Sequence, residues 1–314
     1  MYHRIDHCYF PTPFKLTANT GSAMRIGLGQ LGYGRCLIDN NLFERQDGEV
    51  ELIENKSHEN VYIHNTFRNC QAQMSFRQGH STIFLHNIME ATYTKYFYGG
   101  LGMWMDEHIV AGNYFSFPNG SYVPLDKKMK QRQDRLPASV VRFTCGYKDF
   151  IQKDKSYATH LSAQNSIFAN NTFFDCKDEP FDLSYEESKL PQMNGYPASR
   201  PYGNTIKNNT FAYTGKKADR IYANPNDEDF KLNTIENNIV YTKENISENP
   251  NTIFTIRHKS LETVSKWMDK IFGHLRYDIN KLANSRIAEI KEENGNINPS
   301  LMVNLCFSLL LSIL

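Results

Sequence analysis

The apolar positions of this chain fall in short runs that accompany a repeated Asn-x-apolar pattern. Runs of this kind, bounded by Asn and Gly, predict β-strands, and no helical pattern of ten or more residues lies between them. Successive copies are 24, 22 and 26 residues apart, and the later gaps of 58, 38 and 29 fit one or two coils with loop insertions. A period of about 20 to 30 residues predicts a solenoid. The copies begin at Asn41, Asn65, Asn87, Asn113, Asn171, Asn209 and Asn238.

The strand pattern and its period together favour an all-β parallel β-helix, in which each coil stacks about 4.8 Å from the last. An Asn suits each corner because it tolerates left-handed backbone angles and because its amide can pair with the Asn of the next coil. A low-symmetry β-sandwich with Asn-rich turns is the alternative.

The pattern changes at Leu261, after which apolar residues recur every three or four positions. This spacing predicts an amphipathic helix over residues 261–293, which could cap the coil or bind a partner. We therefore expect a β-helix domain at 1–255 and a helical tail with an apolar end at 256–314. The apolar end, 14 residues long, is too short for a membrane-spanning helix, which needs about 20 residues.

Charge and cysteine content narrow the choice of partner. The net charge of +1 means that any affinity for a polyanion must be local. Six cysteines without CxxC spacing disfavour a zinc or redox motif, and we expect buried thiols rather than disulfides, with Cys8, Cys70 and Cys176 beside the apolar residues of coils. The first residues contain no signal peptide and already resemble a coil. Because solenoids need caps, we expect that the chain lacks its natural beginning.

The candidate chemistry lies in residues 41–79. Glu49 and Glu51 are two residues apart, so on a strand both side chains point to one face. Adjacent carboxylates repel and need a cation, and oxygen ligands at this spacing suit Ca²⁺, although two solvated glutamates would explain the pair equally well. Lys56 follows a corner, and Arg77 comes 21 residues later, close to one repeat. Stacking would bring these residues to one face together with Asn19, one coil back.

Several ordered segments resemble family six of the polysaccharide lyases, which contains alginate lyases and chondroitinase B. The resemblance covers roughly residues 1–245 and implies a right-handed parallel β-helix, with this chain a member truncated at its N-terminus. The segments are NTGSAMRIG at 19–27, NLFERQDGEVELIENKS at 41–57, ENVYIHNTFRN at 59–69, FRQG at 76–79, HIVAGNYF at 108–115 and IFANNTFFDC at 167–176.

The resemblance implies β-elimination of a uronate-containing polysaccharide, alginate before dermatan or chondroitin sulfate, by an enzyme that is extracellular or periplasmic. It implies a Ca²⁺ ion held at the positions of Asn19, Glu49 and Glu51. The matching base is Lys56, and the second catalytic residue is Arg77. The residues expected to bind substrate are Arg25, Gln78, His80 and His108.

This chemistry is physically reasonable. The C5 proton of a uronate is poorly acidic while the adjacent carboxylate is charged, and a divalent cation on that carboxylate stabilises the developing enolate. Nearby positive charge favours the neutral form of a lysine, which can then take the proton. A guanidinium can stabilise the departing oxygen by charge-assisted hydrogen bonds, although it is too weak an acid to be a good proton donor.

Three positions depart from the family pattern. Ser22 stands where the family has Glu, Gln78 stands where it has a substrate-contacting His, and Gly102 stands where it has an Arg. These changes leave Lys56 and Arg77 in place but weaken the expected contacts with the sugar. A β-helix that binds an acidic polysaccharide without cleaving it is therefore the alternative function.

Overall fold

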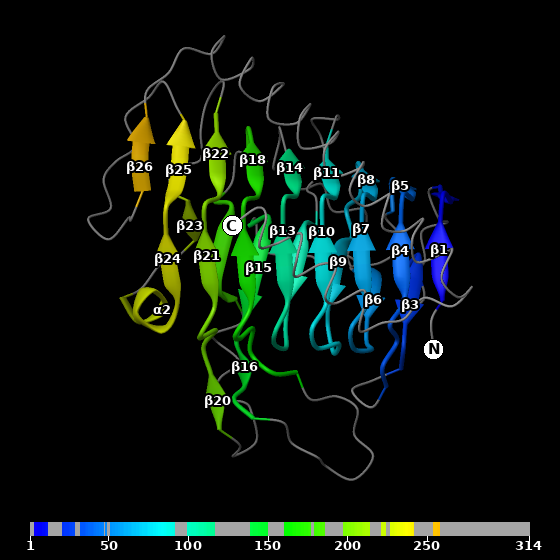
Figure 1. Ribbon diagram of the computed structural model, residues 1–314, viewed down its shortest axis with the longest axis horizontal. Coiled ribbons are helices and arrows are strands. Elements are labelled where there is room, and N and C mark those ends of the chain that lie inside the picture. The colour runs from blue at the N-terminus through cyan, green and yellow to red at the C-terminus, as the bar shows by residue number, and fades with distance from the viewer. Residues whose placement is uncertain are drawn as a thin grey trace, which may run out of the picture.

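The computed structural model forms a right-handed parallel β-helix, so the predicted fold class is confirmed and the β-sandwich alternative is wrong. Figure 1 shows its strands side by side in successive coils. The residues that the structure describes are 3–11, 21–28, 32–46, 48, 51–91, 99–116, 139–149, 160–176, 179–185, 197–213, 221–223, 227–241 and 254–257.

Each complete coil contributes one strand to each of three parallel sheets. The first sheet contains β1 (Arg4–Asp6), β4 (Leu37–Asp39), β7 (Val61–Ile63), β10 (Ile83–Leu85), β13 (Ile109–Ala111), β17 (Ile167–Ala169), β21 (Thr205–Lys207) and β24 (Thr234–Glu236). The second contains β2 (Tyr9–Phe10), β5 (Leu42–Glu44), β8 (Thr66–Arg68), β11 (Ile88–Glu90), β14 (Tyr114–Ser116), β18 (Thr172–Phe174), β22 (Thr210–Ala212), β25 (Asn238–Tyr241) and β26 (Phe254–Arg257). The third contains β3 (Met24–Ile26), β6 (Glu51–Asn55), β9 (Gln73–Phe76), β12 (Leu101–Met103), β15 (Val141–Thr144), β19 (Phe181–Tyr185) and β23 (Tyr222–Ala223).

Two smaller elements accompany the coils. β16 (Gly146–Tyr147) pairs antiparallel with β20 (Ala198–Ser199), and the short helix α2 (Asp227–Leu232) precedes β24. The predicted amphipathic helix at 261–293 and the apolar end lie outside the described residues. In the part of the chain that is described, no helix is long and apolar enough to cross a membrane.

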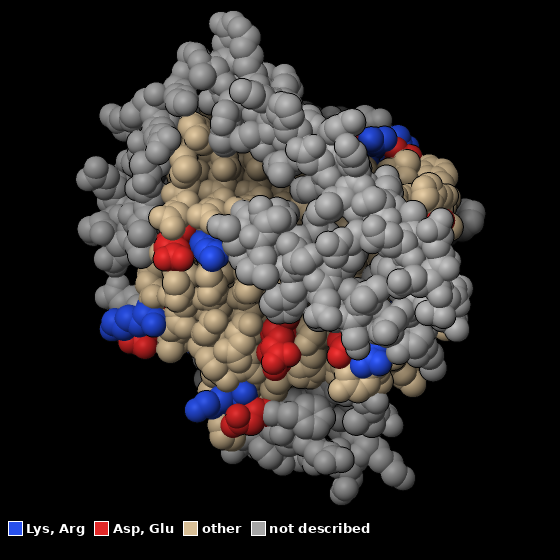
Figure 2. Space-filling view, in the orientation of Figure 1, with Lys and Arg blue, Asp and Glu red and all other residues tan. Residues whose placement is uncertain are grey.

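Charged side chains on the surface pair across neighbouring coils. Arg35 Nε lies 2.6 Å from Glu59 Oε2, and Arg68 Nε lies 2.7 Å from Glu90 Oε1. Figure 2 shows basic and acidic side chains next to one another at several places on the face in view. Pairs of this kind do not build a field of one sign, so any attraction for a polyanion must come from a local site.

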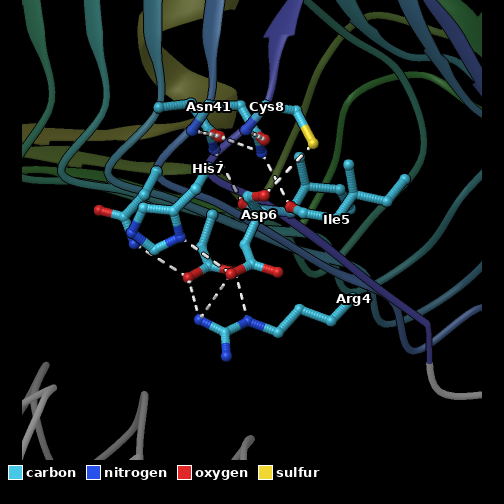
Figure 3. Close-up of polar contacts among 10 residues, drawn as sticks. Arg4, Ile5, Asp6, His7, Cys8 and Asn41 are labelled. Atoms are coloured by element: carbon cyan, nitrogen blue, oxygen red, sulfur yellow. Dashed lines mark hydrogen bonds and ion pairs between the residues drawn. The ribbon is translucent and has the colours of Figure 1, made fainter.

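A ladder of buried asparagines follows the turn between the first and second sheets. Asn41 accepts a hydrogen bond from the Cys8 backbone and donates one to Ile5 O, as Figure 3 shows. Each later Asn repeats this arrangement, with Asn65 Oδ1 accepting from both the backbone and the amide of Asn41. The predicted pairing of amides is therefore confirmed. The expected left-handed angle belongs instead to the preceding residue, such as Asn40 with φ of 55°.

A second ladder occupies the residue just before each strand of the first sheet, and His108 is one of its members. The Thr82 backbone donates to His108 Nδ1 at 3.1 Å, and the His108 backbone donates to Ser166 Oγ at 3.1 Å. His108 Nε2 lies 2.6 Å from the Trp104 carbonyl oxygen, to which it donates. This ring is wholly buried and replaces the Asn found at equivalent positions such as Asn204.

Stacked aromatic rings fill the core behind the second sheet. The rings of Phe10 and Phe43 are 4.6 Å apart, and those of Phe43 and Phe67 are 4.9 Å apart, with nearly parallel planes. None of the cysteines that the structure describes forms a disulfide. Cys70 and Cys176 are buried as predicted, but Cys8 is exposed because it belongs to the first described coil, where it contacts the Asp6 carbonyl oxygen.

Candidate active site

Lys56 and Arg77 each follow directly after a strand of the third sheet. Lys56 follows β6, Arg77 follows β9, and these two strands are parallel neighbours with Glu54 opposite Ser75. Because adjacent parallel strands end at the same edge of a sheet, the two cationic side chains start one coil apart on one side of the molecule. The side chain of Lys56 is 13% exposed and that of Arg77 is 35% exposed, so both reach the surface.

An irregularity in β6 turns a second carboxylate to this face. Glu51 lies opposite Gln73, but Ile53 lies opposite Met74, so one residue of β6 has no partner on β9. An extra residue of this kind is a β-bulge, and it reverses the alternation of side chains beyond it. Glu51 and Glu54 therefore share a face although they are three residues apart, and Arg77 Nη1 pairs with Glu51 Oε2.

Glu54 is the centre of the cluster. Its side chain is 1% exposed, and its Oε2 pairs with the Lys56 amine and lies 3.8 Å from Arg77 Nη1. Its Oε1 accepts a hydrogen bond from Arg25 Nε at 2.9 Å and one from Ser22 Oγ at 3.3 Å. Arg25 comes from β3, directly opposite Glu54, and remains 42% exposed. One buried carboxylate thus contacts cationic side chains from three successive coils.

The charge of Glu54 follows from these contacts. Burial alone would raise the pKa of Glu54, but hydrogen bonds from Arg25 and Lys56, with the charges of both, outweigh that effect and leave the pKa below its ordinary value. Glu54 is therefore a carboxylate at neutral pH. Among the described residues of the cluster, three cationic side chains accompany the carboxylates of Glu51 and Glu54, so these five residues together carry a net positive charge.

His160 lies beside Arg77, and Trp104 lies beside His160. Arg77 Nε donates to His160 Nε2 at 3.3 Å, which requires that this ring nitrogen carry no proton. The rings of His160 and Trp104 have centroids 6.3 Å apart. His160 comes 83 residues after Arg77 in the sequence, so only the coiling of the chain brings them together.

A buried polar network supports the end of β6. Asn55 is fully buried, and its Oδ1 accepts hydrogen bonds from Asn60 Nδ2 at 2.7 Å and Tyr62 Oη at 2.9 Å. Its amide donates to Thr82 Oγ1 at 2.7 Å. Fully satisfied networks of this kind are rigid, so the backbone from which Lys56 departs is held firmly.

The remaining predicted residues lie apart from this cluster or outside the described chain. Gln78 is buried, and its backbone donates to Asn55 O at 3.0 Å. His80 pairs with Asp106, and its ring lies tilted beside that of His58 with the two centroids 4.7 Å apart. His108 is buried in the second ladder, which does not support a direct contact with substrate. Asn19 and Glu49 lie outside the described residues.

Of the three residues expected to bind Ca²⁺, only Glu51 lies in the part of the chain that the structure describes. The carboxylate oxygens of Glu51 are of the kind that Ca²⁺ prefers. In this structure they pair with Arg77, so a bound cation and Arg77 would share them. The described residues contain no group of three or more His, Cys, Asp or Glu side chains that could hold a metal ion.

Comparison with known proteins places the chain in a family. A family model described as Chondroitinase B matches residues 1–279. The chain belongs to the chondroitinase B family. A search of curated protein sequences finds no match.

Solved structures share the fold of this chondroitinase B family member. A mutant of the PL6 family alginate lyase AlyGC is 20% identical with a TM-score of 0.62, over 82% of this chain and 31% of that protein. A mannuronic acid specific family 6 lyase from human gut microbiota is 16% identical with a TM-score of 0.59, over 86% and 56%. A PL6 alginate lyase in complex with a trisaccharide is 17% identical with a TM-score of 0.55, over 77% and 48%. The family member therefore spans less than two thirds of each of these proteins.

Two residues of this family member's cluster carry no recognisable signal in the sequence. Glu54 was missed because regular alternation of side chains along the strand would place it on the other face from Glu51. The pattern of residue types gives no sign of the bulge that brings both to one face. His160 was missed because it stands alone in the sequence, far from the motifs, and no local spacing marks it. Ser22, noted only as a departure from the family pattern, proves to donate to Glu54.

Proposed function

We propose that this chain is a polysaccharide lyase that cleaves a uronate-containing glycan by β-elimination, with alginate the first candidate and dermatan or chondroitin sulfate next. The observation that carries the proposal is the meeting of Lys56 and Arg77 at neighbouring strand ends, where both approach Glu54. An amine and a guanidinium side by side provide a base and a stabiliser of negative charge. Membership of a family of such lyases supports the same activity.

In this proposal, Lys56 takes the proton from C5 of the uronate. The electrons of that C–H bond form a double bond between C4 and C5, and the bond between C4 and the glycosidic oxygen breaks. Arg77 donates hydrogen bonds to the departing oxygen, which then takes a proton from solvent, because a guanidinium is too weak an acid to give one up readily. Arg25, which is part-exposed beside the cluster, pairs with a substrate carboxylate.

We also propose that Ca²⁺ binds at Asn19, Glu49 and Glu51. When bound, the ion supplies positive charge that neutralises a substrate carboxylate and makes the neighbouring C–H bond more acidic. An extracellular or periplasmic location is part of the same proposal, since acidic polysaccharides are substrates found outside the cell.

The test follows the ultraviolet absorbance of new unsaturated sugar ends. The chain is incubated with alginate, polymannuronate, polyguluronate or dermatan sulfate, with added Ca²⁺ or with EDTA. We expect a Ca²⁺-dependent rise that Lys56→Ala lowers by roughly 10²- to 10⁴-fold. Lys207→Ala, on β21 of the first sheet, is the matched control and should retain the wild-type rate. Binding of the glycans without any new unsaturated ends would contradict the lyase proposal and favour a binding protein.

A further inference from the structure

We propose that Glu54 is a positioning residue of this site: its two carboxylate oxygens divide the cations between them and so fix where the Lys56 amine lies relative to the Arg25 guanidinium. The inference rests on the proposed lyase function for its effect on catalysis. The contact between Glu54 and Lys56 can be tested without any activity.

The two carboxylate oxygens of Glu54 have different partners. Oε1 faces Arg25 and Ser22, with Arg25 Nε at 2.9 Å, whereas Oε2 faces Lys56 and has Arg77 Nη1 at 3.8 Å. Arg25 extends from β3, Glu54 from β6 and Arg77 from the end of β9, so the carboxylate joins three consecutive coils. A long lysine side chain loses much rotamer freedom when it is held this way, which is what a preorganised base requires.

Because its side chain is buried, Glu54 can act on the reaction only through other residues. At 1% exposure, its side chain has no surface with which to touch a polysaccharide, whereas Arg25 and Arg77 are part-exposed. A buried carboxylate whose partners include exposed cations can affect the reaction only by holding those partners.

The first experiment measures how fast an amine-acylating reagent labels Lys56 in the full chain at neutral pH without substrate. Peptide mass spectrometry gives the rate relative to Lys207 in the same molecule. We expect Glu54→Gln to raise the relative rate about tenfold, because removal of the charged partner breaks the ion pair that holds the amine away from the reagent. Glu54→Asp keeps the charge but shortens the side chain by one methylene, so Lys56 loses its fixed contact and we expect a rise of roughly threefold or more.

The matched control is Asp39→Asn. Asp39 is also 1% exposed and also holds an arginine, with Arg4 Nε at 2.9 Å and Arg4 Nη2 at 2.7 Å, but it lies on β4 of the first sheet. Figure 3 shows the guanidinium of Arg4 in this setting, near Asp6 and His7. This variant removes a buried carboxylate of the same kind, so a loss of stability alone would change both variants, whereas our proposal leaves Lys56 labelling in Asp39→Asn within twofold of wild type.

The second experiment separates kcat from KM with whichever glycan yields unsaturated ends. We expect both Glu54 variants to lower kcat by about 10- to 100-fold, while KM stays within about threefold because Glu54 does not touch the glycan. A role limited to neutralising buried charge would leave Glu54→Asp at the wild-type kcat, and that result would overturn the proposal. Unchanged Lys56 labelling in a folded Glu54→Gln or Glu54→Asp chain would overturn it equally. If the wild type makes no unsaturated ends, the lyase proposal fails, and the labelling result still decides whether Glu54 positions Lys56.

Discussion

Glu51 and Glu54 both approach the guanidinium of Arg77, although they stand three positions apart on one strand. Arg77 Nη1 pairs with Glu51 Oε2 and lies 3.8 Å from Glu54 Oε2. A regular strand would turn these carboxylates to opposite faces, one of them into the apolar core. The bulge between Glu51 and Ile53 prevents this, so a local irregularity of the backbone determines the composition of the site.

Arg77→Lys tests whether the forked shape of the guanidinium matters. Arg77 contacts Glu51 with one nitrogen and His160 with another, and a single ammonium cannot make both contacts from the same place. We expect kcat/KM on the cleaved glycan to fall by about 10²- to 10³-fold with the fold intact.

The control for this prediction is Arg68→Lys. Arg68 is part-exposed on β8 and pairs with Glu90, so the same exchange there should leave the rate within twofold of wild type. Retention of more than half of the wild-type kcat/KM by Arg77→Lys would show that charge alone suffices at position 77.

The sequence predicts where the candidate site lies better than it predicts which residues form it. Lys56 and Arg77 were expected one coil apart because 21 residues separate them, and the structure has them at the ends of neighbouring strands. The two-residue spacing of Glu49 and Glu51 predicts these two as the acidic residues of the site and gives no reason to choose Glu54. Counting along a strand assumes that side chains alternate without interruption, and residue types alone do not reveal where a strand carries an extra residue.

The asparagine ladder makes a prediction about stability that does not depend on function. Asn209 is fully buried, and its Oδ1 accepts from the backbone and amide of Asn171 while its amide donates to Phe168 O. Asn209→Ala leaves these buried groups without partners, so we expect the free energy of unfolding to fall by roughly 2–5 kcal/mol in urea titrations.

The neighbouring residue provides the control. Asn208 has a left-handed φ of 55° and is not fully buried, so Asn208→Gly suits its backbone and should change the unfolding free energy by less than about 1 kcal/mol. Equal losses in the two variants would mean that the corner conformation, rather than the ladder, carries the stability.

His108 should make the fold sensitive to mild acid. Burial lowers the pKa of His108 to about 4, against an ordinary value of 6.5, although its contact with Trp104 O and the charge of Asp106 act in the opposite direction. The folded chain therefore holds this ring neutral, and its stability is full above pH 6.5 and falls as the pH drops toward 4, while the unfolded chain takes up the proton. Between pH 6.5 and 5 the loss is roughly 2 kcal/mol.

His108→Asn should remove that part of the acid sensitivity. An Asn at this position matches Asn204 in the same ladder and keeps a hydrogen-bond acceptor for Thr82. Urea unfolding at pH 7 and pH 5 should show a smaller difference in the variant than in wild type, with a residual decline from His86, whose pKa burial also lowers to about 4. An identical difference in both proteins would contradict the prediction.

Calcium binding can be followed through thermal stability. A ligand that binds only the folded chain stabilises it by about 2.7 kcal/mol at 100 times its Kd. We expect millimolar Ca²⁺ to raise the Tm of the wild type and EDTA to reverse the change. Glu51→Gln should abolish the increase, because it removes a proposed ligand, whereas Asp39→Asn should retain it. A wild-type Tm that is the same in Ca²⁺ and in EDTA would count against the metal.

The fold itself could be predicted because repetition is visible in residue types. Asn recurs where a buried amide must bridge two coils, and Phe recurs where rings stack, as in Phe43 and Phe67. A histidine in a family motif suggests contact with substrate, whereas in the structure His108 takes the place of a ladder amide, with one ring nitrogen accepting a hydrogen bond and the other donating one. Only the neighbours in space distinguish those roles.

The ladder also separates the spacing of coils from the length of chain between them. Asn65 and Asn87 are joined by the same bond pattern as Asn113 and Asn171, although 22 residues separate the first pair and 58 the second. The additional residues lie between β14 and β15 and between β15 and β17, so long stretches can be added there without changing the pitch of the scaffold. Under the proposed function, changes in these stretches would alter which polysaccharide is bound. The Lys56 amine and the Arg77 guanidinium would keep their places on the coils.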